Sequence, residues 1–188
     1  WPSRFGMGAW PPGAVVAGPV VAAAVILDPG NIPHGLNDSK ALTQKRRDHL
    51  FGEICKTSLA ISWHSNSAKR IDEINILQAS LEAMEKSVAG LPEQCDAALF
   101  DGRDVPLACR NFGTAIIKGD AKSLSIAAAS IIAKVIRDRI MIQMDACYPE
   151  YGFAGHKGYG AKKHMEAIAH HGSCPLHRMS FSPLRERV

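Results

Sequence analysis

The sequence predicts a single α/β domain, because short apolar runs of strand length alternate with longer segments that have the apolar period of a helix. The apolar runs 97–100 and 115–117 are each followed by a turn that carries an aspartate, Asp101 and Asp120. Over 126–144, apolar residues then recur at three- and four-residue steps, which predicts a long helix with one apolar face. A chain of 188 residues is long enough for one such domain with a sizeable core.

The N-terminal half of the chain supplies the other expected elements in order. Residues 15–27 are rich in Val and Ala and predict a buried strand. A helix is expected over 43–55 with Thr43 as its cap, and a strand over 59–63. Residues 71–88 have the spacing of an amphipathic helix that packs against the core. The apolar stripe of this helix consists of Ile74, Leu77, Leu81, Met84 and Val88.

The two ends of the chain differ from this regular pattern. Residues 1–14 are rich in Pro and Gly and have no clear period, so we expect an atypical, irregular start to the domain. Residues 148–164 are rich in Gly and predict a loop, and residues 162–171 predict a short helix. Aromatic residues alternate with lysines in this loop, a pattern that suits stacking on a base or sugar together with pairing to phosphate.

Composition and charge narrow the class of protein. The hydrophobic content of 46% and charged content of 21% are typical of a soluble globular protein, and no apolar run is long enough to cross a membrane. Five cysteines without Cys-x-x-Cys spacing indicate reduced thiols in a cytosolic protein. From Lys118 onward the chain has 11 Lys and Arg against 6 Asp and Glu. This excess suggests a polyanionic partner, although a solvated basic face explains it equally.

Asp101 and Asp120 carry the main chemical hypothesis. In an open α/β sheet, carboxylates at strand ends meet at the working edge, where they can bind a hard divalent cation. Both residues also have a purely structural explanation. Asp-Gly after a strand is a common turn, and Asp120 with Ser123 stands where the cap and first turn of the long helix are expected. Spacing alone leaves the two explanations open.

Seven segments, in the same order, resemble ribonuclease HII, the bacterial type 2 ribonuclease H. They are AGPVVAAAVILDP (17–29), LNDSKALTQKRR (36–47), IDEINILQASLEAM (71–84), FDGR (100–103), KGDAKSLSIAAASIIAKVIRDR (118–139), YPEYGFAGHKGYGAKKH (148–164) and HRMSF (177–181). The resemblance implies a ribonuclease H-like fold over 1–188, with a mixed sheet flanked by helices. It also implies a helical C-terminal part, 145–188, that shapes a substrate groove.

The same resemblance implies an activity and its requirements. It implies an endonuclease that uses Mn²⁺ or Mg²⁺ to hydrolyse the RNA strand of RNA–DNA hybrids. A DNA duplex with an embedded ribonucleotide is the other implied substrate. We expect a cytoplasmic monomer that does not bind membranes.

The resemblance assigns roles to particular residues. Asp101 and Asp120 match two of the family's four catalytic, metal-binding carboxylates, and Tyr159 matches the tyrosine that stacks at the RNA–DNA junction. The lysines expected to bind substrate are Lys40, Lys118, Lys122 and Lys157. For Lys40 a solvated helix face is the alternative, and for Lys118 and Lys122 it is local charge balance around Asp120.

One motif of the family is missing. Counted back without gaps from Ala17, the Asp of the Asp-Glu-x-Gly-Arg-Gly motif falls on Ala9 and the Glu on Trp10, and no acid precedes Asp28. Neither Ala nor Trp can bind a cation through its side chain, so the remaining two carboxylates predict a weak, water-rich site. We therefore expect this chain to cleave hybrids poorly or not at all. The alternative is a catalytically inactive remnant that still binds hybrids.

Overall fold

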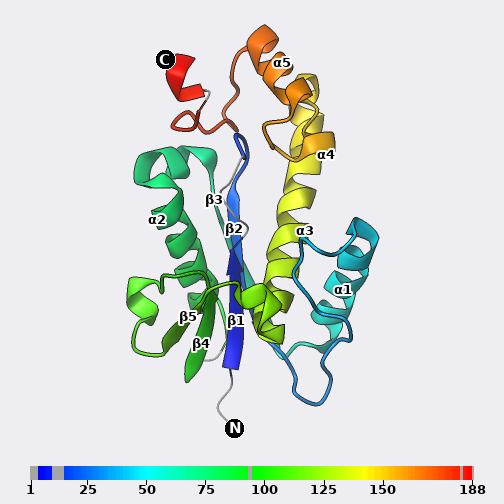
Figure 1. The fold of residues 1–188 in the computed structure, drawn as a ribbon, viewed down its shortest axis with the longest axis vertical. Helices are drawn as coiled ribbons and strands as arrows, with labels where there is room; N and C mark the ends of the chain where they lie inside the picture. Colours follow the sequence, from blue (N-terminus) through cyan, green and yellow to red (C-terminus); the bar gives the residue numbers. More distant parts are fainter. Residues whose placement is uncertain (1–3, 10–14, 93–94, 183, 188) are drawn as a thin grey trace. The chain divides into compact units, whose positions relative to one another are not determined.

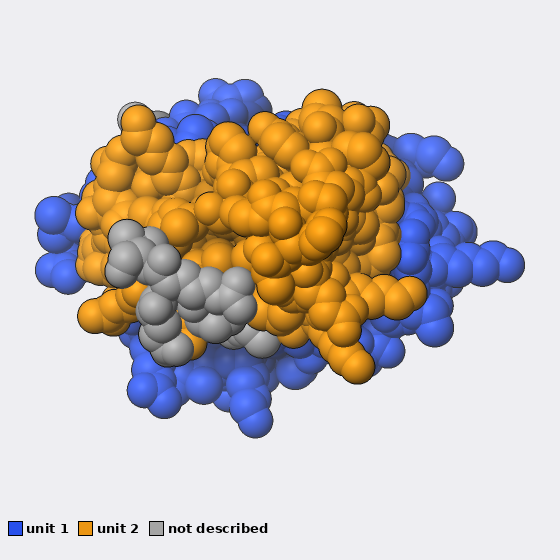
Figure 2. All heavy atoms as spheres, turned by 90° about the horizontal axis from the view of Figure 1, so that it is seen from above, with its two compact units in different colours: residues 1–10, 21–65, 80–135 blue, residues 11–20, 66–79, 136–188 orange. Residues whose placement is uncertain are grey.

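The computed structural model describes residues 4–9, 15–92, 95–182 and 184–187 (Figure 1). The chain divides into two compact units, coloured separately in Figure 2. Unit 1 comprises residues 1–10, 21–65 and 80–135, and unit 2 comprises residues 11–20, 66–79 and 136–188. The single-domain organisation expected from the sequence stays a prediction.

Unit 1 contains nearly all of a five-stranded mixed sheet with the strand order β3-β2-β1-β4-β5 (Figure 1). The strands are β1 Arg4–Ala9, β2 Val20–Ile26, β3 Ala60–Asn66, β4 Ala97–Asp101 and β5 Gly113–Ile116. β1 pairs antiparallel with β2 and parallel with β4, which pairs parallel with β5. Met7 lies opposite Phe100. Because β1 and β4 run parallel, Ala9 and Asp101 finish their strands at the same end of the sheet.

Strand β2 consists mainly of small apolar residues, so other elements can pack closely against it. β2 is buried along its whole length. Ala22 and Ala24 of β2 and Phe100 of β4 pack with Ala83 and Met84 of helix α2 (Ala68–Ala89) in one apolar cluster. Burying a side chain as large as Phe100 contributes about 1.5–3 kcal/mol. The helices are α1 Gln44–Thr57, α2 Ala68–Ala89, α3 Leu124–Cys147, α4 Phe153–His156 and α5 Lys162–His171.

The expected cap of α1 is confirmed, and the expected start of α3 is right for Ser123 but wrong for Asp120. The side chain of Thr43 accepts a hydrogen bond from the backbone N–H of Arg46 at 3.3 Å, as an N-cap residue does. Ser123 directly precedes α3, and its carbonyl accepts from the backbone N–H of Ala127 at 2.9 Å. Asp120 does not lie in the first turn of α3. It belongs to a separate 3₁₀ turn, Gly119–Ala121, that follows Lys118 in a left-handed conformation (φ 55°).

The single apolar stripe expected over 71–88 is wrong at Leu77, which is 50% exposed. The cause is Asn75, whose φ of 67° and ψ of 166° interrupt helix α2. The Asn75 side chain accepts from the backbone N–H of Gln78 at 3.1 Å, so it caps the following turns as if a new helix began there. The interruption changes which residues of the later turns face the core.

The strand expected over 15–27 is also shorter in the structure. β2 begins at Val20, because Gly18 has a φ of 91° and turns the backbone out of the extended conformation. In unit 2, Val15 instead forms an isolated antiparallel bridge with Tyr159, and Ala17 forms one with His177. Residues 15–19 therefore connect two distant parts of the C-terminal sequence.

Two buried arginines hold this connecting segment through its carbonyl oxygens. Arg137 and Arg178 are 1% and 2% exposed. Arg137 donates to the carbonyls of Pro19 at 3.1 Å, Ala17 at 3.1 Å and Lys157 at 2.9 Å. Arg178 donates to the carbonyls of Val15 at 3.2 Å, Gly18 at 3.0 Å and Pro19 at 3.3 Å. The guanidinium groups thus replace the sheet partners that this irregular backbone lacks.

None of the described helices has both the length and the apolar character needed to span a membrane.

Candidate active site

Asp101 and Asp120 are neighbours in unit 1. Asp101 is the last residue of β4 and is half-buried, as is Asp120. The Asp101 Oδ1 atom accepts a hydrogen bond of 2.8 Å from the backbone N–H of Gly119, the residue directly before Asp120. A Cβ atom on Gly119 would lie 2.5 Å from Cδ1 of Ile126, so a larger residue in this turn would have to displace the end of the Ile126 side chain. The end of β4 and the turn after β5 thus bring the two carboxylates together.

The electrostatic environment of Asp120 is acidic. Burial raises the pKa of the Asp120 carboxyl above its usual value, and the charges of Asp101 and then Asp38 raise it further. Lys40 and a backbone hydrogen bond from Ala121 partly oppose this rise. Asp38 was not predicted as a site residue from the sequence, although it lies in segment 36–47, which resembles ribonuclease HII. Its oxygen Oδ1 accepts from the backbone N–H of Lys40 at 2.8 Å.

This arrangement suits a hard divalent cation held through few protein ligands. A cation between Asp101 and Asp120 would remove the like-charge cost, and Mg²⁺ and Mn²⁺ prefer carboxylate and water oxygens. Within the described part of the chain, no group of three or more His, Cys, Asp or Glu side chains could hold a metal ion. Ala9 finishes β1 at the same end of the sheet, and Trp10 lies outside the described residues. The donor set fits a largely hydrated ion.

The lysines predicted to bind substrate differ in their surroundings. Lys118 and Lys122 are exposed on either side of Asp120, and Lys40 is exposed in the loop before α1. Lys157 belongs to unit 2, where its ammonium group donates to the carbonyl of Ala154 and its backbone has a left-handed φ of 53°. Three of the four lysines therefore lie in unit 1, as the two acids do, and Lys157 lies in unit 2.

Tyr159, the predicted stacking residue, lies in a tightly held loop of unit 2. The carbonyl of Gly158 accepts from the backbone N–H groups of Val16 at 2.9 Å and Ala17 at 3.1 Å. The half-buried Tyr159 ring has the guanidinium of Arg137 6.0 Å from its centroid. The backbone that carries the tyrosine is thus fastened to the segment after residue 14, where the family's Gly-Arg-Gly sequence would end.

Gly158 offers a direct test of this loop. Its φ is +81°, and an added Cβ would lie 2.3 Å from the carbonyl oxygen of Ala17. We expect Gly158→Ala to lower the free energy of unfolding by about 2 kcal/mol or more, because it combines left-handed strain with a backbone clash. Urea unfolding measures this change. Gly155→Ala is the matched control, since its Cβ meets nothing within 4 Å, and it should leave stability unchanged or slightly higher.

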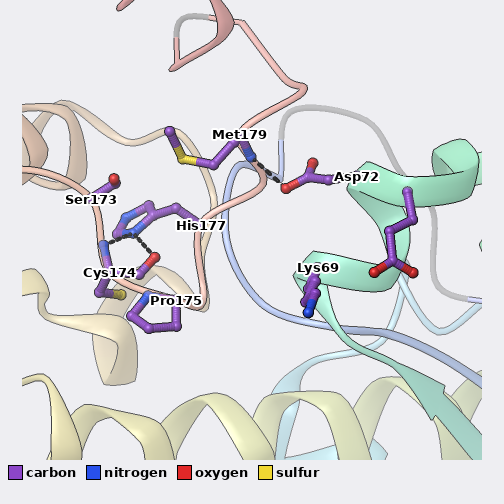
Figure 3. Close-up of a pocket in the computed structure, with 8 residues that line it drawn as sticks. Lys69, Asp72, Ser173, Cys174, Pro175, His177 and Met179 are labelled. Carbon is purple, nitrogen blue, oxygen red and sulfur yellow. Dashed lines mark hydrogen bonds between the residues drawn. The ribbon is translucent and has the colours of Figure 1, made fainter. Parts of the chain in front are cut away.

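A separate pocket of about 640 Å³ is lined only by residues of unit 2 (Figure 3). Its lining consists of Lys69, Asp72, Glu73, Ser173, Cys174, Pro175, His177 and Met179. The carboxylate of Asp72 accepts from the backbone N–H groups of Met179 and Ser180, both at 2.9 Å. This acid therefore fastens the C-terminal segment to α2 and is already occupied by hydrogen bonds.

The sequence profile of ribonuclease HII matches residues 13–183. The chain belongs to the ribonuclease HII family. The ribonuclease HII of Rhizobium meliloti (strain 1021) is 57% identical over 171 residues, which cover 91% of this chain and 79% of that protein. The ribonuclease HII of Shewanella amazonensis is 52% identical over 174 residues, with 91% and 82% covered.

Solved structures of related proteins agree with the fold of this chain. The ribonuclease H2 of Pyrococcus horikoshii OT3 superposes with a TM-score of 0.77 at 26% identity, covering 96% of this chain and 95% of that one. The ribonuclease HII of Archaeoglobus fulgidus, solved in a complex with PCNA, gives a TM-score of 0.76 at 27% identity, covering 96% and 95%. The predicted ribonuclease H-like fold and the assignment as a type 2 ribonuclease H are confirmed. The roles of individual site residues stay predictions.

Proposed function

We propose that this ribonuclease HII is a metal-dependent endonuclease for the RNA strand of RNA–DNA hybrids and for ribonucleotides embedded in DNA. The observation that carries the proposal is the proximity of two carboxylates. Asp101 ends β4, and its Oδ1 atom accepts a hydrogen bond from the backbone N–H of Gly119, directly before Asp120. A neighbouring carboxylate and burial together make an ionised Asp120 unfavourable, and a bound cation is the natural compensation. In this proposal the two acids hold Mn²⁺ or Mg²⁺.

The bound ion would supply the chemistry that this chain's side chains cannot. When bound, Mg²⁺ or Mn²⁺ lowers the pKa of a bound water and neutralises charge at phosphate oxygen. The chain's own groups orient the substrate: the four lysines Lys40, Lys118, Lys122 and Lys157 pair with phosphates, and Tyr159 stacks on the nucleic acid. A basic set of this kind binds any nucleic acid, so recognition of ribonucleotides depends on the tyrosine loop.

We further propose that hydrolysis by this chain is impaired. Ala9 ends β1 at the same end of the sheet as Asp101, which supports the count that puts the missing acid at this position. With alanine there, a cation loses a strong ligand. The alternative function is a catalytically inactive protein that binds hybrids, and the absence of acids before Asp28 favours it. We place both forms in the cytoplasm as a monomer.

The deciding experiment measures binding and cleavage side by side. The chain is titrated into an RNA–DNA hybrid at several salt concentrations in a gel-shift assay, then incubated with the hybrid and Mn²⁺. We expect salt-dependent binding with trace cleavage at most. Lys118→Ala and Lys122→Ala should each reduce the slope of log affinity against log salt by about one.

The controls separate the possible results. Asp101→Asn with Asp120→Asn should abolish any cleavage and any thermal stabilisation by Mn²⁺, which ligand binding to the native state would otherwise give. Binding without any cleavage supports the inactive form. Turnover typical of an intact ribonuclease HII would refute the impairment, and a chain with no affinity for hybrid would refute both functions.

A further inference from the structure

Two histidines of unit 2 meet inside the protein, although neither belongs to the residues assigned to catalysis. His164 of α5 is 0% exposed and His177 is 2% exposed, and their Nε2 atoms lie 3.1 Å apart. A hydrogen bond between two imidazole nitrogens needs one donor and one acceptor. One Nε2 therefore carries a hydrogen and the other does not.

The backbone groups at the two ends of the pair define which nitrogen carries the hydrogen. Nδ1 of His164 lies 2.7 Å from the carbonyl oxygen of Tyr159, and because a carbonyl only accepts, this nitrogen donates. In a neutral His164, Nε2 then accepts from the Nε2–H group of His177. Nδ1 of His177 accepts from the backbone N–H of Cys174 at 2.9 Å, a shorter distance than the 3.2 Å to the Cys174 carbonyl. The contacts at both ends therefore give the same order of donors and acceptors: Cys174 donates to His177, His177 to His164, and His164 to the carbonyl of Tyr159. Figure 3 shows the contacts between Cys174 and His177.

A third imidazole packs against this pair. The ring of His156 stacks on that of His164, with centroids 4.2 Å apart and an angle of 15°. His156 Nδ1 accepts from the backbone N–H of Gly158 at 3.1 Å, and its Nε2 lies 2.7 Å from the carbonyl oxygen of Tyr151. His156 is thus held as the Nε2–H tautomer. The histidines together bind the backbone of Gly158 and Tyr159.

We propose that His164 and His177 are positioning residues that hold Tyr159 in the orientation in which its ring stacks on the RNA–DNA junction. This inference rests on the substrate role of Tyr159 in the proposed function. The hydrogen-bond chain ends on the carbonyl of Tyr159 itself, and the N–H of Tyr159 donates to the carbonyl of His156 at 3.0 Å. With both backbone groups held, the direction of the Cα–Cβ bond is defined. The histidines do this without touching substrate.

The chain of hydrogen bonds requires both imidazoles to be neutral. Burial lowers the pKa of His164 to about 4, aided by His156 and His177 and opposed by the bond to Tyr159. Burial also lowers the pKa of His177. Ionisable groups near His177 also include Tyr151, whose ring centroid lies 4.9 Å from that of His177, and His156, whose charge lowers the pKa of His177 further. Cys174 lies in the same loop as His177, and Lys69, Asp72 and Glu73 of α2 line the same pocket. Protonation of either acceptor nitrogen would leave two donors facing each other.

A dependence of stability on pH follows from these pKa values. At pH values well above the ordinary histidine pKa of 6.5, His164 and His177 are neutral in both the folded and the unfolded chain, and their full contribution to stability is present. Below 6.5 the unfolded chain binds protons that folded His164 takes up only near pH 4, so stability falls over this range. Urea unfolding at intervals between pH 7.5 and 4 measures the decline. His164→Asn should make it shallower, and an unchanged decline would contradict the assignment to His164.

Binding measurements test the positioning role itself. The full chain is titrated in EDTA with a duplex that carries one ribonucleotide and with an all-DNA duplex of the same sequence. We expect His164→Leu to reduce the preference for the ribonucleotide by about tenfold, the effect of losing one hydrogen bond, while affinity for all-DNA duplex stays constant. His164→Asn should restore most of the preference, because its amide nitrogen replaces Nδ1. His170→Leu, at an exposed position of α5, is the control and should change neither affinity.

The outcomes separate this inference from the proposed function. If the unmodified chain shows no preference, or Tyr159→Ala leaves its preference intact, the substrate role of Tyr159 fails and the positioning role fails with it. If Tyr159→Ala removes the preference but a folded His164→Leu keeps it, the positioning role alone is overturned. Nitrogen NMR of the unmodified chain at pH 7 gives a result independent of any variant. We expect hydrogen on Nδ1 of His164 and on Nε2 of His177, and any other pair of tautomers overturns the inference.

Discussion

Replacing Ala9 by Asp and Trp10 by Glu should raise the rate of hybrid cleavage in Mn²⁺ by about 100- to 1,000-fold. The physical reason is the number of oxygen ligands at the end of the sheet. A metal ion contributes several kcal/mol of charge stabilisation to phosphodiester hydrolysis, but only if carboxylates hold it in place, and each 1.4 kcal/mol changes the rate about tenfold. Single-turnover cleavage of a duplex with one ribonucleotide measures the change.

The control for this variant is the same pair of substitutions combined with Asp101→Asn. If the restored acids act with Asp101 on one ion, this triple variant should return to the trace rate of the original chain. Ala9→Asn with Trp10→Gln has similar shape without charge and should not gain activity. A restored chain that stays inactive would show that the Gly-Arg-Gly turn, replaced here by other residues, is also required.

The sequence predicted the parts of this site that depend on local patterns. Apolar runs that stop at Asp101 and before Asp120 indicate strand ends, and parallel strands put such ends together. The resemblance then identified the family and its fold, which the comparisons confirm. Thr43 was predictable as a cap because capping depends on a hydrogen bond within one turn.

Several features that the sequence did not predict depend on contacts between residues that are distant in the sequence. Arg137 and His164 are polar residues within the predicted helices 126–144 and 162–171, and nothing in the sequence indicated that both are buried with backbone carbonyls accepting their hydrogens. Asn75 gave no signal of a helix interruption, since Asn also occurs within helices. The strand β1 was not expected either, because its Gly-rich sequence lacks strand propensity and its pairing with β2 and β4 supplies the order instead.

Arg137→Met should lower the free energy of unfolding by about 3 kcal/mol. Methionine fills much of the same volume, but it cannot donate to the carbonyls of Pro19, Ala17 and Lys157 that Arg137 binds. A buried carbonyl that loses its donor costs about 1–3 kcal/mol. Arg178 still donates to Pro19, so two carbonyls bear most of this loss. An opposing effect is that the substitution removes a buried positive charge. Burial lowers the pKa of Arg137, which shows that burying this charge has a cost.

We expect the lost hydrogen bonds to outweigh this relief, because truncating one partner leaves the other buried groups without compensation. Urea unfolding should give a lower midpoint with an unchanged slope, which shows that stability and not compactness has changed. Arg110→Met is the matched control, since Arg110 is exposed, and it should stay within about 0.5 kcal/mol of the original chain. If Arg137→Met proves as stable as that control, the cost of burying the charge equals the worth of its hydrogen bonds. Residues 15–19 would then be held by packing and by their bridges to Tyr159 and His177.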